Sequence, residues 1–338
     1  MTTSQDELAR LDDRLDRLAN LDIGNRGVEY LYEASRALEG GSLVGAAADR
    51  LLAVPQGGTV VITTGSVSRA WITPEVGEND GPSGAAAIVR ALVLARNVTC
   101  VVLAEEALLQ PLGAVMTAAG LTSVDFQTAR AASTDGSLAT VVMQAYPTDD
   151  EAGADRAPGM LDHIKPDLLF STERVGRNEK GVYHNMSGRD YGMGRARVDL
   201  LFDEAIARGL PVVAVGDGGN EIGMARVRDA VVAHVPYGDR CQCGCGGGIV
   251  AVTGADVLVS AACSNWGCTA IVAAMAARTG NARLLHTPEA EGRLLDCMVA
   301  NGLINSTHGV VDDNVDGIAR ASHIAVAELC RSIVAPVL

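Results

Sequence analysis

The four consecutive apolar residues Val212 to Val215 leave few choices of fold. Three of them are β-branched, and a strand without polar alternation is typical of one that is buried on both faces of a sheet. The glycine-rich sequence that follows ends this strand abruptly and lets the backbone come close to a ligand. Asp217, Asn220 and Glu221 lie in this loop. Taken alone, the loop could also be a solvated turn with a helix cap.

Similar apolar runs recur along the chain, and segments with helical periodicity separate them. The strand-like runs are Thr59–Thr64, Val98–Leu103, Ser123–Gln127, Thr140–Ala145, Asp167–Thr172, Pro211–Val215, Ala230–Val235 and Asp256–Ala261. The helical runs are Ser83–Ala95, Ala107–Ala119, Arg195–Arg208, Cys268–Arg278, Pro288–Asn301 and Asp313–Val334. This alternation predicts an α/β fold of the doubly wound type, with a mostly parallel sheet flanked by helices.

The chain divides by pattern into two parts. Residues 1–56 form a predicted N-terminal helical segment, in which leucines from Leu8 to Leu18 recur at helical spacing. This segment could pack on the outside of the fold or on a second subunit, and in the second case the protein would be a homo-oligomer. Residues 57–338 form the predicted α/β catalytic domain. The stretch 148–158 is rich in Asp, Ala and Gly, and we interpret it as a surface connection that could separate two lobes.

Composition and charge narrow the classes of partner. The formal net charge is -14, which repels nucleic-acid backbones and anionic membrane surfaces. Aromatic residues make up only 3% of the chain, too few for a base-stacking platform. No apolar run reaches the roughly 18 residues of a membrane helix, and the acidic N-terminus does not resemble a signal peptide. We therefore expect a cytoplasmic protein without nucleic-acid or membrane partners.

The eight cysteines do not describe a disulfide scaffold in a chain of 338 residues without a signal peptide. Cys241, Cys243 and Cys245 stand apart, because they alternate with single residues ahead of three glycines. They could hold a soft metal or a redox pair, although the spacing is not the Cys-x-x-Cys of common zinc sites. The favoured interpretation is an unliganded, flexible glycine-rich loop.

Polar, glycine-bearing turns follow four of the predicted strands. In an open parallel sheet, ligands bind beyond the carboxyl ends of the strands, so these turns predict one shared pocket. Each turn also has a plain structural interpretation: Asp80 and Ser264 could cap helices, and Arg174 and Arg177 could form surface ion pairs. The turns comprise residues 65–68 with 75–84, 173–177 with 181–186, 216–223 and 264–267.

Together these motifs resemble those of the D-glutamate cyclase family. The matching stretches are Glu-Asn-Asp-Gly-Pro-Ser-Gly-Ala from residue 78, Glu-Arg-Val-Gly-Arg from 173, Gly-Val-Tyr-His-Asn-Met from 181, Gly-Asp-Gly-Gly-Asn-Glu-Ile-Gly-Met from 216 and Ser-Asn-Trp-Gly from 264. The resemblance runs from about residue 57 to about residue 310. It implies a small acidic substrate and the reversible, ATP-independent conversion of D-glutamate to 5-oxo-D-proline and water. The turn 65–69 and the loop from Cys241 depart from the family pattern.

This chemistry assigns roles to the charged residues of the turns. The substrate amine must lose a proton before it attacks, and Glu221, Asp217 or Glu173 could accept it if burial raises the pKa of the carboxyl group. Arg174 and Arg177 offer planar guanidinium groups that could bind the substrate α-carboxylate. His184 is a second-choice proton carrier.

The remaining polar groups could bind substrate or metal. Asn220, Asn265, Ser264 and the helix start at Trp266 could donate to the oxyanion, and the predicted substrate site also includes Gly65, Glu78, Asp80 and Asn185. Clustered carboxylates repel one another unless they share protons or bind a hard cation. We therefore expect a Mg²⁺ or Mn²⁺ site at Asp80, Asp217 and Glu221, and no organic cofactor.

Two other classes of function fit the same pocket. It could hydrolyse or form another lactam, lactone or cyclic imide, or it could bind a small acid without chemistry. A nucleotide-binding module is disfavoured, because the chain has no Gly-x-x-x-x-Gly-Lys-Ser/Thr loop and the loop at Gly216 is not Gly-x-Gly-x-x-Gly.

Overall fold

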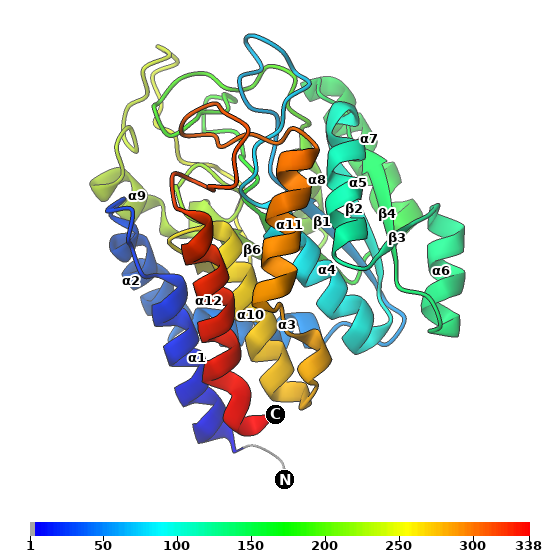
Figure 1. The fold of residues 1–338 in the computed structure, drawn as a ribbon. Helices are drawn as coiled ribbons and strands as arrows, with labels where there is room; N and C mark the ends of the chain where they lie inside the picture. Colours follow the sequence, from blue (N-terminus) through cyan, green and yellow to red (C-terminus); the bar gives the residue numbers. More distant parts are fainter. Residues whose placement is uncertain (1–3) are drawn as a thin grey trace.

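A single seven-stranded parallel sheet forms the centre of the molecule in the computed structural model, which describes residues 4–338 (Figure 1). The order of the strands across the sheet is β3-β4-β2-β1-β5-β6-β7. This architecture confirms the predicted α/β fold. The strands are β1 (Thr59–Thr64), β2 (Thr99–Ala104), β3 (Thr122–Ser123), β4 (Thr140–Ala145), β5 (Leu168–Thr172), β6 (Val212–Gly216) and β7 (Val257–Ser260).

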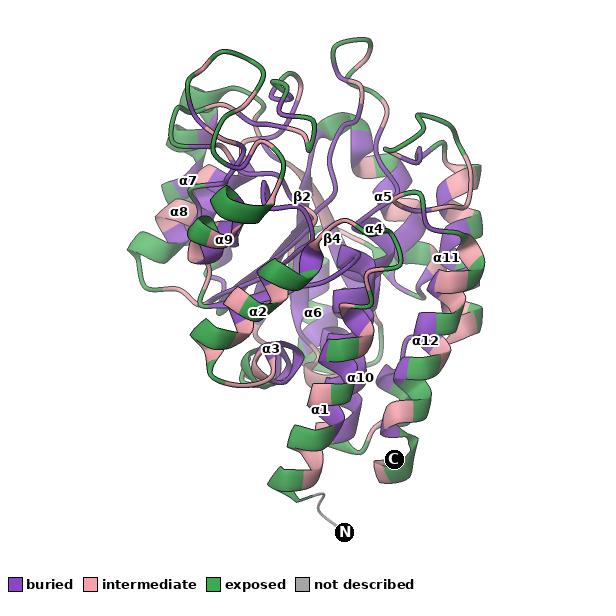
Figure 2. Ribbon diagram, turned by 90° about the vertical axis from the view of Figure 1, so that its left-hand side faces the viewer, coloured by how far each residue is buried: buried purple, intermediate pink, exposed green. Residues whose placement is uncertain are grey.

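Helices cover both faces of the sheet, which explains why its central strands are apolar without alternation. Val60 and Ile62 of β1 face the core formed with α4, α5 and α10, whereas Val61 faces α7 and α8. Figure 2 shows the buried strands between helices whose outer sides are exposed. The helices are α1 (Gln5–Ala19), α2 (Val28–Glu39), α3 (Leu43–Leu52), α4 (Pro82–Arg96), α5 (Leu109–Ala118), α6 (Phe126–Asp135), α7 (Asp150–Ile164), α8 (Val198–Ala207), α9 (Arg228–His234), α10 (Ser264–Thr279), α11 (Pro288–Ala300) and α12 (Arg320–Val334).

The strand order reverses direction at β1. The strands β2, β3 and β4 that follow β1 in the sequence all lie on one side of it. The later strands β5, β6 and β7 lie on its other side. Thr64 at the end of β1 pairs with Thr172 at the end of β5, so residues 65 and 173 leave the sheet side by side. A crevice beyond the strands is expected at such a switch point, and the long loops of the molecule gather there (Figure 1).

The N-terminal segment is helical, as predicted, and packs on the chain itself. Leu11 and Leu15 of α1 are buried in the main core, and α1 lies against α10 and α12. Asp16 accepts hydrogen bonds from the backbone N–H groups of Leu43 and Val44 at 2.9 Å, which satisfies the start of α3. The loop between α1 and α2 reaches the carboxyl ends of the strands.

Four segments differ from the sequence-based assignment. Residues 313–319 form a loop ahead of α12 rather than the start of that helix. Residues 230–234 belong to helix α9 rather than to a strand, because Val231 packs in a small core with Leu31 and Met224. Of the predicted strand 123–127 only Ser123 belongs to a strand, β3, since Asp125 caps α6 by accepting from Gln127 and Thr128. Finally, most of the expected surface connection 148–158 is helix α7.

The predicted division into two lobes near residues 148–158 does not interrupt the sheet. β1 and β5, which precede and follow these residues in the sequence, pair directly. Within residues 4–338, none of the helices is long and apolar enough to span a bilayer.

Candidate active site

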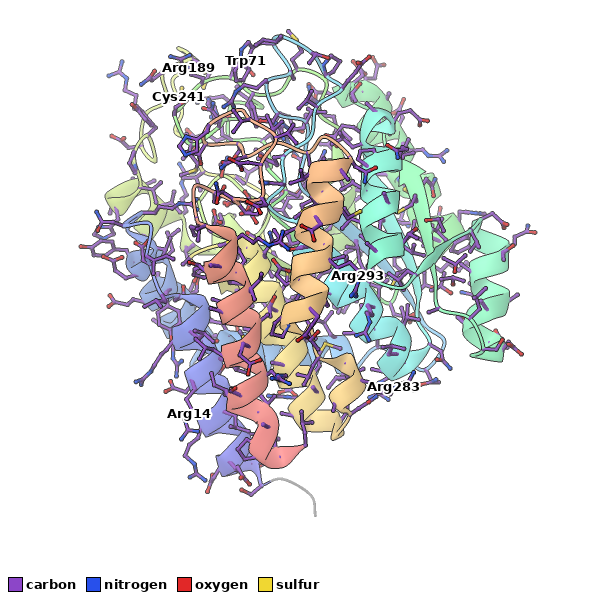
Figure 3. All side chains as sticks on the ribbon, in the orientation of Figure 1. Arg14, Trp71, Arg189, Cys241, Arg283 and Arg293 are labelled. Carbon is purple, nitrogen blue, oxygen red and sulfur yellow. The ribbon has the colours of Figure 1, made fainter. Side chains whose placement is uncertain are left out.

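A cavity of about 890 Å³ opens beyond the carboxyl ends of β1, β5 and β6. Four of the predicted site residues line it: Glu78, Glu173, Asn185 and Asn220. Arg189 and Trp71, which also line it, lie at the loop end of the molecule, opposite Arg14 (Figure 3). The charged residues of the wall are Arg26, Arg69, Glu78, Glu173, Arg189 and Asp316.

Glu173 is the first residue after β5 and contributes a carboxyl group to the wall. Its backbone has a φ of 55°, which only a few per cent of non-glycine residues adopt and which is frequent at functional turns. Ser264 Oγ donates to Glu173 Oε2 at 2.6 Å from the first turn of α10. Burial and the nearby negative charge of Asp217 raise the pKa of Glu173 well above its usual value. The raised pKa makes the ionised carboxyl group a stronger base than an exposed glutamate.

Asp217 lies beneath the wall and is held by Arg26. Arg26 Nη2 donates to Asp217 Oδ1 at 2.7 Å, and the backbone N–H of Ser264 donates to Asp217 Oδ2 at 3.1 Å. The same guanidinium contacts Asp316 Oδ2 at 2.5 Å. Burial raises the pKa of Asp217 to about 8 against the opposing effect of Arg26. Arg26 thus brings two carboxyl groups together at the cavity.

Two further carboxyl groups follow β1. Glu78 accepts from Ser66 Oγ at 2.8 Å, and burial raises its pKa to about 7. Asp80 accepts from the backbone N–H of Gly81 at 2.8 Å, and burial together with Asp316 raises its pKa well above the usual value. Gly81 has a φ of 94°, and a Cβ there would lie 2.6 Å from Thr64 Oγ1. Only glycine therefore allows Asp80 to approach the end of β1 so closely.

The carboxyl group of Glu221, in the loop after β6, is held by the backbone of the same loop. Glu221 accepts from the N–H groups of Asp217, Gly218 and Gly219 at 3.0, 2.7 and 2.7 Å. Both of its oxygens are therefore engaged, and Glu221 holds the loop in shape. Asn220 Nδ2 donates to the carbonyl oxygen of His184 at 2.7 Å, which ties this loop to the opposite wall.

Asn265 also acts on another segment rather than from the cavity wall. Its Oδ1 accepts from the backbone N–H groups of Gly81 and Gly84 at 3.1 and 2.9 Å. These bonds satisfy the start of α4 and fix the turn that carries Asp80. Trp266 is buried in the core, where its Nε1 donates to His323 Nδ1 at 2.9 Å.

The expected carboxylate clamp is not at the cavity. Arg174 is fully buried and donates to both oxygens of Glu105, at 2.8 and 3.0 Å, and to two carbonyl oxygens, one of them that of Gly65. Arg177 pairs with Asp199 at 2.7 Å and with Asp203 at 2.5 Å. Neither lines the cavity, so the prediction that they bind the substrate carboxylate is corrected. The reason is that both guanidinium groups form ion pairs with carboxylates distant in sequence, Arg174 with Glu105 and Arg177 with Asp199 and Asp203.

Four charged residues of the wall were missed from the sequence: Arg26, Arg69, Arg189 and Asp316. Arg69 donates to the carbonyl oxygen of Ser306 at 2.7 Å, and within residues 4–338 neither Arg69 nor Arg189 pairs with a carboxylate. Arg69 and Arg189 follow two of the recognised turns closely, which is the signal that could have found them. Arg26 and Asp316 lie in short glycine-containing loops far from any strand, so only the fold brings them here.

The acidic residues form two groups in which a metal ion could bind. Among the described residues, Asp217 shares one group with Asp80 and Cys263, and another with Glu173 and Glu221. The three predicted ligands therefore do not make a single group. Arg26 already pairs with Asp217, and backbone N–H groups occupy Glu221. These contacts favour carboxyl groups that share protons, and the Mg²⁺ or Mn²⁺ site stays a prediction.

Comparison with known proteins agrees with the motifs around this cavity. The human protein "D-glutamate cyclase, mitochondrial" is 28% identical over 269 residues. That match covers 77% of this chain but only 38% of the human protein, so the chain spans much less than its relative. A family model described as D-glutamate cyclase-like, C-terminal, matches residues 15–330, which contain the whole sheet and all or part of every α-helix. The chain belongs to the D-glutamate cyclase-like, C-terminal family.

Proposed function

We propose that the chain converts D-glutamate to 5-oxo-D-proline and water, reversibly and without ATP. The observation that carries this proposal is Glu173, a carboxyl group with a raised pKa in the cavity wall, hydrogen-bonded to Ser264 at 2.6 Å. The family and the name of the human relative support the choice of reaction.

Substrate orientation is the first task of such a site. Ring closure is intramolecular, and holding the amine against the γ-carboxyl carbon can supply roughly 7 kcal/mol or more. Arg69 and Arg189 line the cavity and have no carboxylate partner among the described residues. A guanidinium group binds a carboxylate through two parallel hydrogen bonds. These two arginines therefore take the clamping role first expected of Arg174 and Arg177.

Proton transfer is the second task. A C–N bond forms and a C–O bond breaks; the substrate ammonium group loses two protons, and the departing γ-carboxyl oxygen gains two to leave as water. Glu173 accepts a proton from the amine, and a protonated carboxyl group of the cluster returns one to the leaving oxygen. Glu78, with a pKa raised to about 7, lines the same cavity and fits the donor role.

The oxyanion of the intermediate also needs stabilisation. Helix α10 begins at Ser264, beside Glu173, and its N-terminal end carries partial positive charge. A Mg²⁺ or Mn²⁺ ion among the carboxylates would supply the same stabilisation.

Proton NMR tests the reaction directly. D-glutamate, L-glutamate and 5-oxo-D-proline are incubated separately with the purified protein, before and after chelation. Lactam formation from the D isomer alone supports the proposal, and loss of turnover on chelation supports the metal. Absence of any conversion in all tubes overturns it and directs the search to other lactams, lactones and cyclic imides, or to binding without chemistry.

A further inference from the structure

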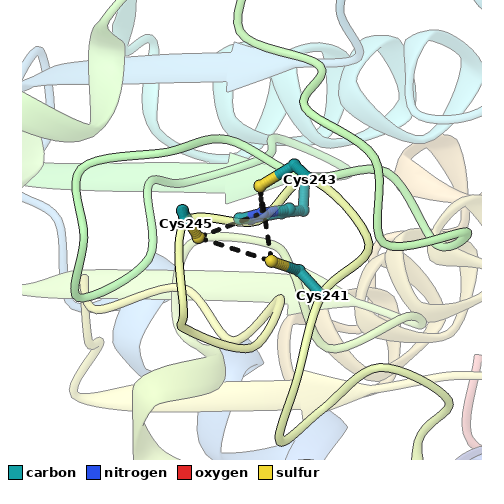
Figure 4. Close-up of side chains that lie close together, drawn as sticks. Cys241, Cys243 and Cys245 are labelled. Carbon is teal, nitrogen blue, oxygen red and sulfur yellow. Dashed lines mark hydrogen bonds between the residues drawn. The ribbon is translucent and has the colours of Figure 1, made fainter.

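Four side chains of metal-ligand type converge outside the carboxylate cluster. Cys241 Sγ lies 3.3 Å from Cys243 Sγ and 3.4 Å from Cys245 Sγ (Figure 4). His184, from a segment nearly 60 residues earlier in the chain, places Nε2 at 3.2 Å from Cys243 Sγ and 3.8 Å from Cys245 Sγ. All four ligand atoms lie within 4.8 Å of one another.

We propose that His184, Cys241, Cys243 and Cys245 bind one Zn²⁺ ion in a tetrahedral site. With Zn–S bonds of about 2.3 Å, tetrahedral geometry separates two sulfur ligands by roughly 3.8 Å. The sulfur atoms approach this spacing and are too far apart for a disulfide, whose S–S bond is about 2.05 Å. Three thiolates and an imidazole are the ligands of structural zinc sites, and thiolates disfavour hard cations such as Mg²⁺.

The surroundings of the cluster support a site rather than a loose loop. His184 is fully buried, so its ring is held in place against the cysteines. Asn178 Nδ2 lies 3.5 Å from Cys245 Sγ and donates to the carbonyl oxygen of Gly248 at 2.7 Å. Such outer hydrogen bonds orient metal ligands. The sequence favoured a flexible, unliganded loop, whereas in the structure the three thiol sulfur atoms gather within 4.8 Å of a ring nitrogen of His184.

The site would brace the wall of the cavity. His184 precedes Asn185 and Arg189, which line the cavity, and the backbone N–H of Gln242 donates to the carbonyl oxygen of Gly188 at 2.7 Å. An ion bound to His184 therefore joins the cysteine loop to this segment. Four protein ligands fill the tetrahedron, so the ion is structural and leaves no position for substrate.

Metal analysis of the full chain tests the proposal. The protein is purified without chelator, and zinc is measured by inductively coupled plasma mass spectrometry together with a count of free thiols. We expect about one zinc per chain, and loss of that zinc in Cys243→Ser and in Cys245→Ser. The matched control is Cys297→Ser on α11, outside the cluster, which should keep its zinc. Circular dichroism reports whether each variant is folded.

Cobalt substitution gives a second readout that does not depend on the stability of a variant. Co²⁺ in the wild-type site should show the visible absorption of tetrahedral coordination and the near-ultraviolet charge transfer of thiolate ligands. Chains without zinc whose thiols are all free, or whose thiols are lost to a disulfide, overturn the proposal, as does a cobalt spectrum without thiolate bands. Zinc content is independent of the proposed reaction, so either can fail while the other stands.

Discussion

Glu173 is the residue on which the proposed chemistry depends most. In Glu173→Gln the side chain keeps its size but cannot carry a proton between amine and leaving oxygen. We expect kcat to fall by about a hundredfold or more, the scale typical of acid–base groups. Lactam formation by NMR measures it, with Glu289→Gln on the exposed surface of α11 as the control. Full activity in Glu173→Gln would remove this residue from the mechanism. Turnover by the wild type that is lost in the variant while substrate binding is retained would exclude a pure binding protein.

Arg69 and Arg189 are predicted to act on affinity rather than on chemistry. Truncation to alanine removes a charge-assisted hydrogen bond to the substrate carboxylate, worth about 1.5–3 kcal/mol. We expect KM to rise by about tenfold to a hundredfold in each variant, with a smaller change in kcat. Arg208→Ala, which removes a surface arginine of ion pairs on α7 and α8, is the matched control. Unchanged KM in both variants would place the clamp elsewhere.

Arg174 should matter for stability instead. Arg174→Met leaves the buried carboxylate of Glu105 without its countercharge, which typically costs about 3–5 kcal/mol. Urea unfolding measures this loss, and the double variant Arg174→Met/Glu105→Gln should recover part of it. A variant with wild-type stability and a raised KM would instead restore the clamping role first expected of this residue.

At the scale of elements, close packing of α4 on α10 holds the turn that carries Asp80 in position. A Cβ at Gly84 of α4 would lie 2.9 Å from Cys268 Cβ and 3.0 Å from Asn265 Oδ1, the atom that caps α4. We expect Gly84→Ala to lower the free energy of unfolding by about 1–3 kcal/mol. Gly159 in α7 is exposed with no atom within 4 Å, so Gly159→Ala should raise it by about 0.5–1 kcal/mol. Urea unfolding measures both changes, and free energies of unfolding that change in the same direction in Gly84→Ala and Gly159→Ala would contradict the packing argument.

Sequence periodicity predicted the central strands correctly but missed some of the helices. The central strands were found because burial on both faces makes them apolar throughout, as in Val212–Val215. Helix α7 was missed because Gly153, Pro158 and Gly159 are poor helix formers, yet Asp149 caps it and Leu161 packs in the core. The short apolar run at residues 230–235 has the length of a strand, and only its packing against α2 makes it a helix.

For the whole molecule, the buried carboxyl cluster predicts how stability changes with pH. The carboxyl group of Asp217 titrates near 3.8 when unfolded but near 8 when folded, so folding takes up a proton between these values. The free energy of unfolding should therefore fall as pH rises, by up to about 1.4 kcal/mol per pH unit for each proton taken up. His323, whose pKa is lowered by burial, has the opposite effect below about 6.5.

Urea unfolding between about pH 7 and about pH 8.5 measures this effect without that of His323. Asp217→Asn should make the profile less steep, because the amide cannot titrate, whereas the raised pKa values of Glu78, Asp80 and Glu173 keep part of the slope. A wild-type profile that is level or rises over this range would show that the cluster does not hold its protons.

The sequence by itself determined the parallel sheet, the strand ends that carry function and the family, because burial on both faces and glycine at the turns are local requirements on residue type. It also named Glu173, which follows β5 directly, and Glu78, which lies in the turn between β1 and α4. Only the tertiary structure decided which charges face the cavity. Arg174 turns inward to Glu105, whereas Arg26 crosses from the N-terminal segment to Asp217, nearly 200 residues away. An ion pair depends on the distance between two groups in space, and the pattern of residue types along the chain does not specify that distance.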